Sequence, residues 1–119
     1  MGRKRFEGKV ALVTGAGRGM GKATAVTLAT EGATVIVNDL SAELAQKVVD
    51  EIAAAGGRAQ VVACDVTNPA AVAGMMKHVV DTFGAIHVLV NNAGILRSTS
   101  PLETIPDNEW EMVLRVNVN

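Results

Sequence analysis

The chain alternates short apolar runs with segments of helical periodicity, and this alternation restricts the possible folds more than any other feature. The apolar runs are typical of strands and cover residues 10–14, 34–39, 59–66 and 86–90. Each run is apolar nearly throughout rather than alternating between apolar and polar, as expected for a strand that is covered on both faces. Such strands belong to a parallel sheet that carries helices on both sides.

Helical patterns fill the intervals between these runs. They cover residues 20–31, 41–55 and 69–83, and glycine follows each of them. Ser41 can cap the second helix, and Pro69 suits the first turn of the third. Because crossovers between parallel strands are right-handed, the sequence predicts an α/β fold with a Rossmann-type doubly wound parallel sheet. We expect strand order 3-2-1-4 within three αβα layers.

Residues 109–119, "EWEMVLRVNVN", are expected to begin a further helix. Trp110, Val113, Leu114 and Asn117 recur at the spacing of one helical face. No glycine or proline follows to end the helix, so the pattern predicts a helix that is still under way at Asn119. Asn117 places an amide on an otherwise apolar stripe, where it needs hydrogen-bond partners and has either a structural or a chemical role.

Length and charge exclude several classes of protein. A chain of 119 residues with 19% charged residues fits one globular domain, and its net charge of −1 gives no field that would attract nucleic acid or an anionic membrane. No apolar run approaches the ~18 residues of a spanning helix. A single cysteine, Cys64, excludes an internal disulfide framework and fits a cytoplasmic protein, while two histidines are too few for a zinc cluster.

The stretch "VTGAGRGMG" carries the strongest functional signal. It places Gly15, Gly19 and Gly21 directly after the first strand and at the start of the first helix. Glycine permits positive φ and lets the backbone approach a pyrophosphate, which the amino terminus of a helix attracts. Asp39 ends the second strand, where a carboxylate can bind the ribose of adenosine. This combination predicts dinucleotide binding rather than a purely structural turn.

The spacing of these glycines resembles the short-chain dehydrogenase/reductase family. "CDVT" at 64–67 and "NNAG" at 91–94 match two further family motifs, and Asn117 matches the asparagine of the family's catalytic helix. The resemblance extends from about Phe6 onward. It is strongest to 3-oxoacyl-carrier-protein reductases and related secondary-alcohol dehydrogenases.

The resemblance implies cofactor-binding roles for twelve residues and a catalytic role for Asn117. The implied contacts to phosphate and ribose are Gly15, Arg18, Gly19, Met20 and Gly21; those to the adenosine ribose are Asp39 and Leu40; those flanking adenine are Asp65 and Val66; and those near the nicotinamide ribose are Asn92, Ala93 and Gly94. Asp65 has an alternative role, which is to cap the loop that follows it. His87 stands where family members often carry an acid, and we expect no contact between it and the cofactor.

The family's chemistry requires a Ser and a Tyr-x-x-x-Lys pair, yet the chain contains no tyrosine. We therefore expect residues 1–119 to be the N-terminal part of a single NAD(P)-binding Rossmann domain that ends within the family's fifth helix. The chain alone is predicted to be inactive. We also expect "VLV" at 88–90 to become an exposed sheet edge, so that the fragment is less stable than its parent, self-associates and binds NAD weakly.

Asp39 and Arg18 favour different cofactors, NAD and NADP respectively. The Asp39 carboxylate would repel a 2′-phosphate, whereas Arg18 is placed to attract one. The two effects are of similar size, about 4 kcal/mol for a close pair near a protein surface. Asp39 can also accept direct hydrogen bonds from ribose, while Arg18 can swing into water. We therefore favour NAD, with NADP as the alternative cofactor.

Three functions follow from these features. The leading hypothesis is a parent oxidoreductase that moves hydride between nicotinamide and a small-molecule carbonyl or secondary alcohol, in a homodimer or homotetramer. The second is a non-catalytic dinucleotide-binding module. The third, a structural α/β fragment that binds nothing, conflicts with the intact glycine loop.

Overall fold

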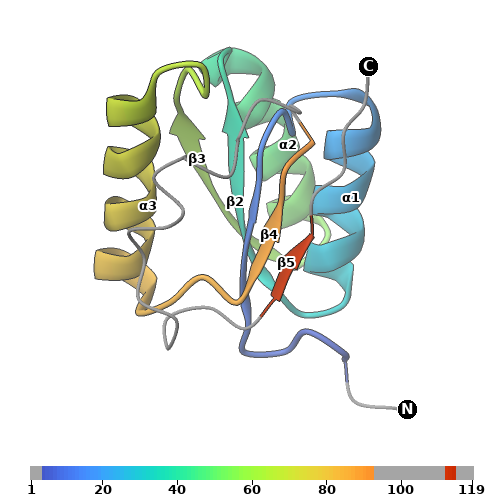
Figure 1. The fold of residues 1–119 in the computed structure, drawn as a ribbon. Helices are drawn as coiled ribbons and strands as arrows, with labels where there is room; N and C mark the ends of the chain where they lie inside the picture. Colours follow the sequence, from blue (N-terminus) through green and yellow to red (C-terminus); the bar gives the residue numbers. More distant parts are fainter. Residues whose placement is uncertain (1–3, 93–111, 115–119) are drawn as a thin grey trace.

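The computed structural model describes residues 4–92 and 112–114, which form a five-stranded parallel sheet (Figure 1). The strands in spatial order are β3 (Arg58–Ala63), β2 (Thr34–Asp39), β1 (Val10–Val13), β4 (Val88–Val90) and β5 (Met112–Leu114). Every neighbouring pair is parallel. The predicted order 3-2-1-4 is confirmed.

Helices cover both faces of this sheet. They are α1 (Gly19–Thr30), α2 (Ala42–Ala54) and α3 (Pro69–Phe83). Figure 1 shows α1 and α2 together on one side of the strands and α3 on the other side. The predicted helix limits are confirmed to within one residue at each end. The three-layer αβα arrangement predicted from the sequence is therefore present in the described part of the chain.

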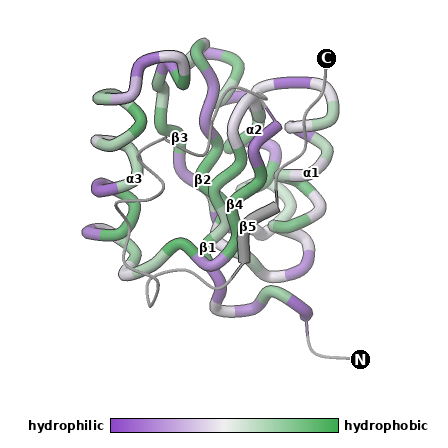
Figure 2. The backbone as a smooth tube through the Cα atoms, in the orientation of Figure 1, coloured by the Kyte–Doolittle hydropathy of each residue, from purple (hydrophilic) through white to green (hydrophobic). Residues whose placement is uncertain are grey.

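Two hydrophobic clusters, one on each face, hold the layers together. Ala11 and Val13 of β1 pack in the cluster that includes α1 and α2, whereas Leu12 packs in the cluster that includes α3. Successive strand residues point to opposite faces, so a strand between two helical layers must be apolar at every position. The hydropathy colours of Figure 2 show this apolar centre along β1, β2 and β4.

The predicted helix signals act as expected at two termini. The Ser41 side chain accepts a hydrogen bond from the Leu44 N–H at 3.2 Å and caps α2. At the carboxyl end of α3, Gly84 adopts φ 91° and ends the helix in the left-handed conformation. Asn68, which precedes Pro69, caps α3 through bonds that its side chain accepts from the N–H groups of Ala70 and Ala71.

The third strand is shorter than predicted. The sequence places it at 59–66, but β3 ends at Ala63, level with the last residue of β2 in the pairing Asp39↔Ala63. The Cys64 N–H still reaches the Asp39 carbonyl oxygen at 3.2 Å, and the chain then turns away. The strand therefore stops because its partner ends, which the apolar run alone does not indicate.

The predicted helix over the C-terminal residues is wrong at 112–114. These residues form β5, which pairs with β4 in the register Val88↔Met112 and Val90↔Leu114. The prediction that β4 becomes a sheet edge is wrong for the same reason, because β4 lies between β1 and β5. Hydrogen bonding to an open strand edge has overridden a helical pattern of short length. Trp110 and Asn117, also in that pattern, lie outside the described residues.

Among the described residues, no helix has both the length and the apolar character needed to cross a membrane. That residues 1–119 belong to one larger domain stays a prediction.

Candidate dinucleotide-binding site

The predicted site lies at the carboxyl ends of β1, β2 and β4, at the upper end of the sheet in Figure 1. The chain leaves β1 through residues 14–18 and enters α1 at Gly19. Strand order reverses between β1 and β4, because β2 and β3 extend the sheet on one side and β4 and β5 on the other. Ligands of open α/β sheets bind at such a switch point, outside the carboxyl ends of the strands.

Two glycines of the loop need their conformational freedom. Gly15 has φ 60° and Gly19 has φ 62°, both in the left-handed region that favours glycine. Backbone hydrogen bonds fasten the start of the loop to two strands: the Thr14 N–H donates to the Val90 carbonyl at 3.0 Å, and the Ala16 N–H donates to the Asn38 carbonyl at 2.7 Å. The turn is therefore held by β4 and β2 on either side of β1.

Gly21 meets a different requirement, which is close packing. A Cβ at this position would overlap the Gly15 carbonyl oxygen and lie 2.7 Å from Asn92 Nδ2. Asn92 itself donates from Nδ2 to the Gly15 carbonyl at 3.2 Å. Three of the predicted site residues, from the loop, α1 and the end of β4, are thus brought together.

The first turn of α1 presents its backbone to the site. Arg18 precedes the helix with extended backbone, φ −167° and ψ 171°, and its side chain makes no capping hydrogen bond. The first turn carries no acidic residue. The N–H groups and the positive end of the helix dipole are therefore available to an anionic ligand. Met20 is 57% exposed beside them.

Asp39 is held in place by two backbone N–H groups. Oδ2 accepts from the Gly17 N–H at 2.9 Å, and Oδ1 accepts from the Ser41 N–H at 3.0 Å. One bond comes from the glycine loop and the other from the turn into α2, so the carboxylate joins the two crossovers that border the site. Leu40, the next residue, is 74% exposed.

Asp65 makes the turn-capping contact that was its alternative role. Its Oδ1 accepts from the Thr67 N–H at 2.9 Å and from Thr67 Oγ1 at 2.6 Å. These hydrogen bonds lower the pKa of the exposed Asp65 carboxyl below its ordinary value. Burial, followed by the nearby Asp65 charge, raises the pKa of the Cys64 thiol. Contacts of Asp65 and Val66 with adenine stay predictions.

Two buried asparagines support the site in roles that were not predicted from the sequence, although Asn91 belongs to the "NNAG" motif. Asn38 donates from Nδ2 to the carbonyl oxygens of Val62 and Cys64, at 3.0 Å and 3.3 Å. Asn91 accepts from Thr14 Oγ1 at 3.2 Å. Both follow apolar strand residues, and a polar side chain at such a position is the signal that could have identified them.

Three of the predicted residues, Ala93, Gly94 and Asn117, lie outside the described part of the chain. His87 is remote from the glycine loop, as expected, and its ring has a structural role. The Val10 N–H donates to His87 Nδ1 at 2.9 Å, next to the bond from the His87 N–H to the Val10 carbonyl at 2.9 Å.

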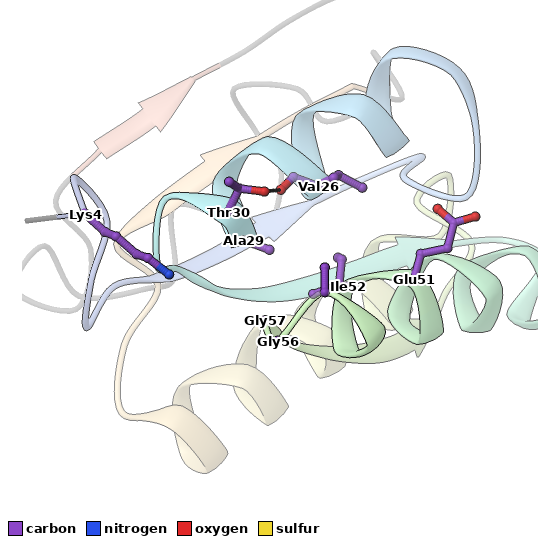
Figure 3. Close-up of a pocket in the computed structure, with 9 residues that line it drawn as sticks. Lys4, Val26, Ala29, Thr30, Glu51, Ile52, Gly56 and Gly57 are labelled. Carbon is purple, nitrogen blue, oxygen red and sulfur yellow. Dashed lines mark hydrogen bonds between the residues drawn. The ribbon is translucent and has the colours of Figure 1, made fainter. Parts of the chain in front are cut away.

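The cavity of about 210 Å³ in Figure 3 is not this site. It lies where α1 and α2 end, lined by Lys4, Thr30, Ile52 and Gly57 among others, and contains none of the predicted cofactor residues. Helix carboxyl ends carry partial negative charge, which disfavours a pyrophosphate. The glycine loop, with its helix amino terminus, is the better site for a dinucleotide.

The doubly wound sheet and a glycine loop at its switch point define a Rossmann-type domain. The family model described as short chain dehydrogenase matches residues 9–119, and the chain belongs to this family.

Two curated relatives illustrate the match. Cyclohexanol dehydrogenase of Acinetobacter sp. (strain SE19) is 45% identical over 115 residues, which cover 97% of this chain and 46% of the relative. The short-chain reductase protein NovJ of Streptomyces niveus is 50% identical over 109 residues, 92% of this chain and 41% of the relative. The chain thus spans less than half the length of these relatives.

A solved structure supports the same assignment. The 7α-hydroxysteroid dehydrogenase complexed with NADH and 7-oxo glycochenodeoxycholic acid matches with a TM-score of 0.72 and 42% sequence identity. The match covers 76% of this chain and 35% of that one.

Proposed function

We propose that the chain is the cofactor-binding half of an NAD(P)-dependent oxidoreductase, which transfers hydride between nicotinamide and a small-molecule carbonyl or secondary alcohol. The observation that carries the proposal is the glycine loop, held by β2 and β4 and opening onto the uncapped amino terminus of α1. Family membership and a relative complexed with NADH support it. In this proposal, the loop and Arg18–Gly21 bind the pyrophosphate, and Asn92, Ala93 and Gly94 lie towards the nicotinamide.

The preferred cofactor in this proposal is NAD. Both Asp39 oxygens already accept one backbone N–H, and each keeps a lone pair for a ribose hydroxyl. A 2′-phosphate at that place would meet the carboxylate at close range, at a cost of up to about 4 kcal/mol near a protein surface. Arg18 is exposed and can offset part of this cost with NADP.

Nucleotide titration of the purified chain tests the cofactor assignment. We expect NAD⁺ to bind more tightly than NADP⁺, so that the ratio of the Kd for NADP⁺ to the Kd for NAD⁺ exceeds one. Asp39→Ala should reduce this ratio at least tenfold, equivalent to about 1.4 kcal/mol. Asp81→Ala removes an equally charged, exposed residue on α3 and is the matched control. An unchanged ratio in Asp39→Ala would show that this carboxylate does not face the ribose.

The chain alone is not expected to turn over substrate. It has no tyrosine to act as the general acid or base of the family's chemistry, so NADH oxidation against a panel of ketones should stay at background. Turnover above background, with host reductases excluded, would contradict this.

If the reading frame continues past Asn119 into a Ser and a Tyr-x-x-x-Lys pair, the enzyme hypothesis is favoured over a non-catalytic dinucleotide-binding module. A cytoplasmic location and a homodimeric or homotetrameric parent belong to the same proposal.

A further inference from the structure

Gly17, at the centre of the glycine loop, is a glycine for a different reason from its neighbours. Gly15 and Gly19 have positive φ, whereas Gly17 does not, so its backbone conformation is open to any residue. The position is nevertheless buried. Its requirement for glycine must therefore come from its surroundings.

Space is what excludes a side chain at Gly17. A Cβ there would lie 2.7 Å from Asp39 Oδ2 and 2.8 Å from Leu44 Cβ, both closer than real Cβ contacts. The Leu44 Cβ belongs to the first turn of α2, whose backbone is fixed by the Ser41 cap. The Asp39 carboxyl group can rotate. A Cβ at position 17 would therefore displace the carboxylate by rotation, and the contact with Leu44 would also require the loop to shift away from α2.

The same residue also holds that carboxylate. The Gly17 N–H donates to Asp39 Oδ2 at 2.9 Å, opposite the Ser41 N–H on Oδ1. Hydrogen bonds from both sides restrict the carboxylate to one rotamer, with one lone pair on each oxygen left for ligand hydroxyls. Gly17 thus both leaves room for the carboxylate and orients it.

We propose that Gly17 is a specificity-determining residue, which sets the preference for NAD over NADP by positioning Asp39. The inference rests on the proposed function, in which Asp39 faces the adenosine ribose. With any larger residue at position 17, the carboxylate leaves the place where it accepts ribose hydroxyls and repels a 2′-phosphate. In this inference Gly17 is a positioning residue, and Asp39 carries its effect on the cofactor preference.

The test is Gly17→Ala in the intact chain, titrated with NAD⁺ and NADP⁺ beside Asp39→Ala. We expect Gly17→Ala to weaken NAD⁺ binding about tenfold or more, the equivalent of one charge-assisted hydrogen bond. NADP⁺ binding should change much less, so that the ratio of dissociation constants approaches that of Asp39→Ala. Gly74→Ala is the matched control, since a Cβ at this exposed position of α3 meets nothing within 4 Å.

A double-mutant cycle separates positioning from general loop damage. In the Asp39→Ala background, Gly17→Ala no longer has a carboxylate to displace and should change the ratio less than about twofold. The contact with Leu44 remains in that background, and its effect falls on both nucleotides alike. The thermal unfolding midpoint of each variant, measured without nucleotide, reports folding independently.

The results of these titrations separate a failure of the proposed function from a failure of the inference about Gly17. If the unaltered chain binds neither nucleotide, the proposed function fails. If it prefers NAD⁺ and Gly17→Ala keeps the same ratio, the inference about Gly17 is overturned while the proposed function stands. An equal loss of affinity for NAD⁺ and NADP⁺ in Gly17→Ala, including loss of all measurable binding, also overturns the inference about Gly17. Gly17 would then support the loop as a whole.

Discussion

Two glycine-to-alanine substitutions in helices should change stability in opposite directions. Gly21 lies in the first turns of α1, and Gly74 lies in the interior of α3. Alanine is favoured over glycine within a helix by up to about 1 kcal/mol, because glycine loses more backbone entropy on folding. Without tertiary contacts, both variants would therefore be more stable than the original chain.

Packing reverses the sign at Gly21 alone. A Cβ at Gly21 overlaps the Gly15 carbonyl oxygen, whereas a Cβ at Gly74 meets no atom within 4 Å. The carbonyl is backbone, so relief requires the loop to move. Overpacking of this kind costs about 1–3 kcal/mol. Losing the hydrogen bond from Asn92 to that carbonyl adds about 1 kcal/mol. After the helix gain, Gly21→Ala should lower the free energy of unfolding by about 1–3 kcal/mol, while Gly74→Ala raises it by about 0.5–1 kcal/mol.

Urea denaturation followed by far-ultraviolet circular dichroism measures both changes. The free energy of unfolding comes from linear extrapolation, and equal slopes in the variants ensure that the same surface is exposed. Stabilisation of Gly21→Ala to the same extent as Gly74→Ala would refute the reasoning, because it would mean that α1 does not pack against the loop as described.

Three further predictions concern His87, Asp65 and Cys64. His87→Leu should lower the free energy of unfolding by about 1–3 kcal/mol, because the Val10 N–H loses its acceptor; His87→Asn, which offers a new acceptor, should recover part of it in the same denaturation assay. Asp65→Asn should destabilise the chain at neutral pH, since the folded pKa of Asp65 is lowered. The difference in stability between Asp65→Asn and the original chain should disappear as pH falls through that pKa, below 3.8. A difference in stability that persists there would contradict a lowered pKa for Asp65. Cys64 should react slowly with iodoacetamide at neutral pH, because its pKa is raised, and Asp65→Asn should speed the reaction; mass spectrometry follows the rate.

Local patterns in the sequence are sufficient for most of the fold. The strands at β1 and β2, the three helices and their glycine ends follow from periodicity and capping, which depend on neighbours along the chain. The glycine loop and Asp39 could be identified for the same reason, because a strand, a turn and a helix follow each other directly. Family membership for residues 9–119 agrees with the motifs at Gly15, Asp65 and Asn91.

Long-range contacts decided the rest. Met112–Leu114 has a helical pattern but forms β5, since its backbone pairs with the edge of β4, a strand that is distant in the chain and not visible in the local pattern. The partners of Asp39, 22 residues from Gly17 in the chain, and of His87, 77 residues from Val10, exist only once the sheet brings distant strands together. The sequence by itself determined the helices and most of the strands, and it predicted which residues bind a dinucleotide. Only the tertiary structure decided how they are held, because hydrogen bonds and steric exclusion act between atoms that are neighbours in space.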